Sequence, residues 1–179
     1  MEVLAQALVS GACRHLETLE VSKARAGTGA RLPQHSAVAA VLGGHAPCSR
    51  SLKVFITGIP MGNHDLLQLA TALSEPTAVR LHVLAVQSRG PGIEGLVALL
   101  EALQRHAGGD LKQLYLAVAL EDLEAADRCL SEALDRGCYP QLERVGVLTQ
   151  EADGDESSSL RGVNSEAALD RRYEQRGMA

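Results

Sequence analysis

The chain has 179 residues and a formal net charge of −5, with 46% hydrophobic but only 2% aromatic residues. This length and this apolar content exclude a largely disordered chain and allow one domain with an aliphatic core. The negative net charge argues against a general nucleic-acid binder, since the neutralisation of phosphates requires clustered Lys and Arg.

The first predicted elements are a helix and a strand. Residues 4–8 read L-x-x-A-L, a spacing that predicts an amphipathic helix. Residues 16–21 read leucine, two residues, apolar, one residue, apolar, which is typical of a strand that buries one face. Because no strand precedes the helix, we expect Val3, Leu4 and Leu8 to be covered by a partner, by a second copy or by an upstream segment.

The strand pattern of residues 16–21 returns four times along the chain. Steps of 36, 29, 30 and 31 residues separate the five leading leucines, and a unit of about 30 residues is typical of stacked repeat proteins. An L-x-x-A-L helix begins 12 residues before each of the last three strands, whereas an insertion (24–35) and an Ala-rich helix (36–44) precede the second. The later strands are predicted at Leu52–Thr57, Leu81–Val86, Leu111–Leu116 and Leu142–Val147, and the helices before the last three at Leu69–Leu73, Leu99–Leu103 and Leu130–Leu134.

Together, these segments resemble leucine-rich repeats, most closely the ribonuclease-inhibitor-like subtype, over residues 1–150. The resemblance implies an α/β fold, a right-handed solenoid of about five strand-loop-helix units with a parallel sheet on its concave face. It also implies that the leading leucines stack in one buried column, on neighbouring parallel strands in sequence order. The family's helix-opening glycine is matched only by Gly95. The family's Asn, eight residues after each leading leucine, is replaced by Ala24, Pro60, Arg89, Ala119 and Gln150, so irregular loops are expected there.

Residues 151–179 differ from the repeats. The segment Glu151–Glu156 is an acidic, solvated loop by composition, and Asn164 or Ser165 is a suitable N-cap for a helix in the charged segment that follows. We expect this second region to be a polar cap on the array or an arm that a partner captures.

Strand alternation also predicts an outward face. If the leading, fourth and sixth residues of each pattern point to the core, the second, third and fifth point outward. On the middle strands these outward residues are apolar and flanked by charge, as at protein–protein contact sites. We therefore predict binding to another protein, as an adaptor or a subunit of a larger assembly, with Tyr115 as the anchor. The predicted contact residues are Val54, Ile56, Val83, Ala85 and Tyr115, with Lys53, Lys112 and Glu143 at the side.

A small nucleotide-binding enzyme domain is the main alternative. In the segment from Lys53, a predicted strand is followed by the Gly58–Gly62 loop and by the start of a helix. In nucleotide-binding folds, backbone N–H groups of such a loop and helix start bind phosphate. Its spacing is G-x-x-x-G and not G-x-G-x-x-G, and no acid ends the next strand. His64 and Asp65 could be a base and its orienting acid, but Asp65 is more simply a first-turn acid that favours the helix dipole. We therefore expect no catalytic residue and no cofactor; regulation of a GTPase is a further alternative that the resemblance implies.

The remaining signals concern redox state, metals and location. The four cysteines (Cys13, Cys48, Cys129 and Cys138) form no C-x-x-C pair and have no His at zinc spacing, so we expect reduced core residues and no metal site. No window of 18 apolar residues predicts a membrane span, and residues 1–15 lack the basic flank of an export signal. We therefore expect a protein of the cytoplasm or another intracellular compartment.

Overall fold

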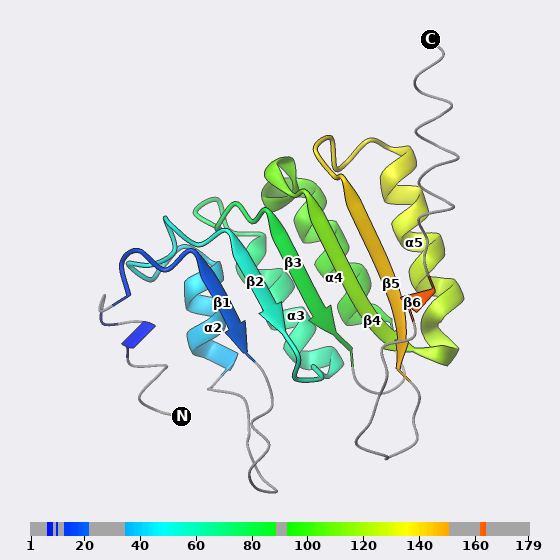
Figure 1. Ribbon diagram of the computed structural model, residues 1–179, viewed down its shortest axis with the longest axis horizontal. Helices are drawn as coiled ribbons and strands as arrows, with labels where there is room; N and C mark the ends of the chain where they lie inside the picture. The colour runs from blue at the N-terminus through cyan, green and yellow to red at the C-terminus, as the bar shows by residue number, and fades with distance from the viewer. Residues whose placement is uncertain are drawn as a thin grey trace, which may run out of the picture.

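The computed structural model describes residues 7, 8, 10, 13–21, 35–88, 93–150 and 162–163. These residues have an α/β fold with one six-stranded sheet, in which the strands follow the order of the sequence (Figure 1). The first five strands are parallel, and the last is antiparallel to its neighbour. The strands are β1 (Thr18–Val21), β2 (Val54–Thr57), β3 (Val83–Gln87), β4 (Gln113–Ala119), β5 (Arg144–Gln150) and β6 (Gly162–Val163). The predicted order of neighbouring parallel strands is confirmed, and these strands do not show the order reversal of a doubly wound sheet.

Helices α2 to α5 lie together on one face of the sheet, behind the strands in Figure 1. They are α2 (His35–Leu42), α3 (Asn63–Leu73), α4 (Glu94–Ala102) and α5 (Leu123–Asp135). A π-helical turn (Leu103–Ala107) follows α4, and 3-10 turns lie at Gly108–Asp110 and Leu120–Asp122. The L-x-x-A-L segments predicted from Leu69 and Leu130 fall inside α3 and α5, and the one from Leu99 extends one residue beyond α4.

The core lies between the sheet and the helices and follows the predicted alternation. Each of the first five strands begins two residues after its leading leucine. Four of these leucines are at most 3% exposed, and Leu16 is partly buried. The fourth and sixth residues of every unit are also buried: Leu19, Val21, Phe55, Thr57, Leu84, Val86, Leu114, Leu116, Val145 and Val147.

The same hydrogen bonds join each strand entry to the next. From the second unit on, the residue after the leading leucine donates its N–H to the carbonyl of the equivalent residue one unit earlier, at 2.7–2.9 Å. The residue after that donates to the same carbonyl at 3.0–3.1 Å. The accepting carbonyls are those of Glu17, Lys53, His82 and Lys112. Because the pair of bonds recurs at all four junctions, the five units share one backbone geometry at the strand entry.

Gly44 allows the turn after α2 to pack against the loop that precedes β3. Its φ is +84°, and a Cβ at this position would lie 1.9 Å from the carbonyl oxygen of Thr77. Two hydrogen bonds hold the segments together: Thr77 Oγ1 donates to the Gly43 carbonyl at 2.7 Å, and the Val79 N–H donates to the Leu42 carbonyl at 2.9 Å. Both the backbone conformation and the close approach therefore require glycine.

Helices α3 and α4 meet at their first turns. A Cβ on Gly95 would lie 2.7 Å from the carbonyl oxygen of Asn63 and 2.7 Å from the Cβ of Leu66. The Asn63 amide donates to the Glu94 carboxylate at 2.7 Å, and its side-chain oxygen accepts the Gly95 N–H at 3.0 Å. The glycine singled out by the family resemblance is thus explained by close helix packing.

Tyr139 links the segment before β5 to α4. Its hydroxyl group is buried and donates to the Leu100 carbonyl at 3.0 Å, just before the π-helical turn. Burial raises the pKa of Tyr139 above its usual range. The hydroxyl group therefore keeps its proton and remains a donor in the folded chain.

Of the three residues in the first layer that were expected to need a cover, the structure describes Leu8. Leu8 is only 1% exposed and belongs to the core, so the expectation that it needs a cover from outside the chain was wrong. Val3 and Leu4, the helix predicted within 164–179 and residues 24–34 of the predicted insertion (24–35) lie outside the described residues, whereas His35 begins α2. Of the C-terminal region, Gly162 and Val163 add β6 to the sheet.

Candidate partner-binding face

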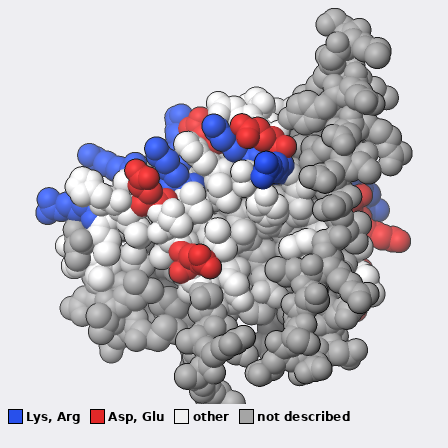
Figure 2. Space-filling model, in the orientation of Figure 1, with Lys and Arg blue, Asp and Glu red and all other residues white. Residues whose placement is uncertain are grey.

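Figure 2 shows the sheet face that points away from the helices. Buried and half-buried residues alternate along β2, β3 and β4, and the half-buried ones, which include the apolar residues of the predicted contact set, point to this face. The strand register places Val54 opposite Val83, and Ile56 opposite Ala85. It also places Ala85 opposite Tyr115 on the next strand. Neighbouring strands are about 4.8 Å apart. These five side chains therefore form one continuous area, called the apolar patch below, across β2, β3 and β4.

Side chains of the apolar patch are each half-buried, and each lies beside an equivalent residue on an adjoining strand. Among the described residues, the exposed large apolar side chains are Leu67 on α3, at 42%, and Leu120 after β4, at 68%. Neither belongs to the patch. The patch is therefore distinguished by its continuity and not by the exposure of any single residue.

Tyr115 reaches from the patch toward β5. Gly146 is its partner in the register, and a Cβ on Gly146 would lie 2.8 Å from the Cδ1 of the Tyr115 ring. The ring therefore covers the backbone of Gly146, as aromatic side chains do for glycines in strands. The hydroxyl group lies 3.4 Å from Gln113 Oε1, a long contact. Tyr115 is thus already held in one place on the face, which lowers the entropic cost of using it as a binding anchor.

The outward face extends beyond the predicted residues. Ala117 and Leu148 are half-buried and lie opposite each other, one step further along β4 and β5. The sequence pattern ended at Leu116 and Val147, whereas β4 continues to Ala119 and β5 to Gln150. Continued alternation after Leu116 was the signal that could have identified Ala117.

Charged residues border the apolar patch at the strand entries. Figure 2 shows Lys, Arg, Asp and Glu side chains gathered along this edge and mostly uncharged surface next to it. The predicted flanking residues Lys53, Lys112 and Glu143 are exposed, and they occupy equivalent positions joined by the recurring backbone hydrogen bonds. The complete row, called the strand-entry row below, reads Glu17, Lys53, His82, Lys112 and Glu143. Its negative charges stand at the two ends and its positive charges in the middle.

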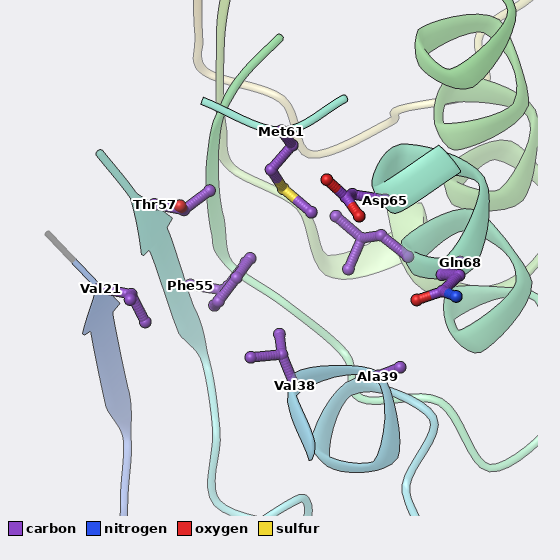
Figure 3. A pocket seen from close by; sticks show the side chains of 9 residues that line it. Val21, Val38, Ala39, Phe55, Thr57, Met61, Asp65 and Gln68 are labelled. Atoms are coloured by element: carbon purple, nitrogen blue, oxygen red, sulfur yellow. The ribbon is translucent and has the colours of Figure 1, made fainter. Parts of the chain in front are cut away.

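The Gly58–Gly62 loop borders a cavity of only about 10 Å³, close to the minimum for one water molecule. Figure 3 shows Phe55 and Met61 directed into this cavity and Asp65 beside it. The Gly62 N–H, at the start of α3, donates to the Asp65 carboxylate at 3.0 Å. A phosphate at this helix start would meet a carboxylate that already accepts the N–H group and repels negative charge.

The remaining residues considered for catalysis, redox chemistry or metal binding are His64, Asp65 and the cysteines. His64 contacts Gln68 at 2.9 Å on the exposed side of α3, while Asp65 caps the same helix. The four cysteines are free, and burial raises the pKa of the Cys48 thiol. Within the described ranges, no three His, Cys, Asp or Glu side chains are grouped so that they could hold a metal ion. No helix in that part of the chain is both long enough and apolar enough to cross a membrane.

No protein-family model and no curated protein matches this chain. Inferences about function therefore rest on the geometry of the sheet face and of the Gly58–Gly62 loop.

Proposed function

We propose that this chain is a right-handed solenoid of the leucine-rich-repeat type that binds another protein through its exposed sheet face, as an adaptor or as a subunit of a larger assembly. The apolar patch is the contact surface, Tyr115 is its anchor, and Lys53, Lys112 and Glu143 flank it. The observation that carries the proposal is the register, which sets five apolar side chains of three strands side by side on the face opposite the helices.

Parallel sheets support this proposal because they are normally covered on both faces. Here, helices α2 to α5 cover one face of five parallel strands. The opposite face carries Val54, Ile56 and Val83, residue types that gain free energy when they are removed from water. A partner that covers this face would complete the second layer.

The repeat character is supported by three observations on the backbone and core. The strands keep sequence order, each leading leucine comes two residues before its strand, and the same pair of hydrogen bonds recurs at all four junctions between successive units. In such arrays each unit contacts its neighbours and the common face offers an extended binding surface.

An enzyme that uses the Gly58–Gly62 loop is the weaker proposal. The Asp65 carboxylate holds the helix start, and the adjoining cavity is about the size of one water molecule. A GTPase remains one class of partner that such a face could bind, although no residue of the face favours it over other proteins.

Site-specific photo-crosslinking tests the proposal. A photoreactive amino acid is placed at Val83, on the sheet face, or at Leu67, the exposed residue of α3. We expect a cross-linked partner, identified by mass spectrometry, from position 83 and not from position 67. Cross-linking from position 67 alone would place the binding site on the helix face and contradict the proposal.

A further inference from the structure

We propose that the partner presents an amphipathic α-helix with acidic residues along one flank, and that this helix lies across strands β2 to β5. Because the site is the sheet face discussed above, this inference rests on the proposed function and adds the chemistry of the partner. It is carried by the distribution of positive charge beside the apolar patch.

Positive charge gathers at the strand entries although the whole chain is negative. Lys53 and Lys112 are exposed in the middle of the strand-entry row, and Arg50 is exposed in the turn before β2. Arg144 is exposed at the start of β5, opposite Gln113 in the register. Lys53, Lys112 and Arg144 therefore border the apolar patch on one side, and Arg50 adds positive charge in the turn that leads to it.

Acidic groups at the same edge neutralise only part of this charge. Glu17 and Glu143 stand at the two ends of the strand-entry row. Asp110 forms an ion pair with Arg80 at 3.5 Å, so these two charges offset each other. On the far side, Glu20 on β1 lies opposite Ile56 and bounds the patch. The middle of the edge therefore presents net positive charge to a ligand on the patch, and carboxylates are the complementary groups.

The spacing of the cations fits a helix. Lys53 and Lys112 are two strands apart, which corresponds to about 9.6 Å. Residues i and i+7 of an α-helix are about 10.5 Å apart along its axis and lie on the same side. A helix across the strands can thus place two carboxylates opposite Lys53 and Lys112 while its apolar stripe covers the patch.

An extended segment and a second copy of this chain fit less well. In an extended segment, residues on the same side repeat at about 6.8 Å and 13.6 Å, neither of which matches the separation of the two lysines. In a face-to-face dimer with its two-fold axis along β3, Lys53 of one copy would face Lys112 of the other, and Glu17 would face Glu143. Such a dimer opposes like charges at both pairs, which costs binding free energy.

Selection from a display library of randomised helical peptides, about four turns long, tests the inference on the full chain. The selected peptides are then measured by fluorescence anisotropy against the wild type and against Ile56→Glu, which places a charge in the patch. The double variant Lys53→Glu/Lys112→Glu reverses the central charges. Its matched control, Arg105→Glu/Arg128→Glu, reverses two exposed cations on the helix side.

We expect the selected peptides to carry Asp or Glu along one flank of an apolar stripe. Ile56→Glu should weaken their binding at least tenfold, the lysine double variant about tenfold, and the arginine control less than twofold. Peptides with Lys in place of their acids should instead prefer the lysine double variant.

Each other outcome overturns the inference. Peptides that lose affinity on Ile56→Glu but carry no acidic flank contradict the helix chemistry and leave the proposed function standing. Selection that enriches nothing contradicts the inference, whereas the cross-linking experiment decides the proposed function. Selection that enriches only peptides insensitive to Ile56→Glu contradicts both. Peptides that bind only after deletion of residues 164–179 would make the chain's own tail the occupant. A wild-type dimer that Ile56→Glu dissociates would make a second copy the occupant.

Discussion

Replacing Gly44 with alanine should lower the free energy of unfolding more than the same replacement does at a glycine in an uncrowded turn. The backbone at Gly44 has a φ of +84°, a conformation that costs an L-residue about 1–2 kcal/mol. The new Cβ would also lie 1.9 Å from the Thr77 carbonyl oxygen, so the turn after α2 must move away from the loop before β3.

That movement sets the size of the effect. It breaks the hydrogen bonds from Thr77 Oγ1 to Gly43 and from the Val79 N–H to Leu42. Each is worth about 0.5–1.5 kcal/mol. Together with the backbone term, Gly44→Ala should lower the free energy of unfolding by about 2–5 kcal/mol.

Gly137→Ala is the matched control, because Gly137 has a φ of +70° but a Cβ at this position would have no neighbouring atom within 4 Å. Its loss should be limited to the backbone term of about 1–2 kcal/mol. Urea denaturation followed by circular dichroism measures both variants, with unchanged m-values as the check for two-state unfolding. If Gly44→Ala loses no more stability than Gly137→Ala, the close contact between these two units is not as described.

Three further predictions concern the core, a buried hydroxyl group and the binding anchor. Leu81→Ala truncates a fully buried leading leucine and should lower the free energy of unfolding by about 2–5 kcal/mol in the same urea assay. Tyr139→Phe should cost about 0.5–1.5 kcal/mol at pH 7, where its hydroxyl group bonds to a carbonyl. Because burial raises the folded-state pKa of Tyr139, above about pH 10 the unfolded chain loses this proton before the folded chain does, so wild-type stability falls as pH rises. Tyr139→Phe should flatten that alkaline decline, and an equal decline in both proteins would contradict the buried donor. Tyr115→Ala should weaken partner binding by about 1–3 kcal/mol, whereas Lys112→Ala should change mainly the association rate and its salt dependence. Gly146→Ala should displace the Tyr115 ring and add little to the effect of Tyr115→Ala; independent effects in this double-mutant cycle would refute the contact.

The two faces of the strands could be predicted because alternation is a local periodicity, and their order could be predicted because each unit of a regular repeat packs on its neighbours in sequence. Leucine spacing fixed the units, and alternation assigned Leu84 and Leu114 to the core and Val83 to the outer face, as the structure has them. The predicted strand starts were also close to the observed ones, since each strand begins two residues after its leading leucine.

Contacts between units could not be predicted, since they depend on residues about 30–40 positions apart in sequence. Gly44 against Thr77, Tyr139 on Leu100 and Tyr115 over Gly146 all arise only when two units pack together. The error at Leu8 has the same origin. Its carbonyl group accepts the Cys48 thiol at 3.6 Å, from a turn that the repeat pattern did not place beside the first helix.

One comparison of affinities distinguishes binding through the sheet face from binding through the helix face. The partner captured by cross-linking is titrated, in an isothermal calorimeter, against wild type, Ile56→Glu on the sheet face and Leu67→Glu on α3. Both variants introduce the same charge at an apolar position on opposite faces. If the partner binds the sheet face, Ile56→Glu should lose at least tenfold in affinity and Leu67→Glu should keep wild-type affinity. Wild-type affinity for Ile56→Glu together with a loss for Leu67→Glu would contradict it.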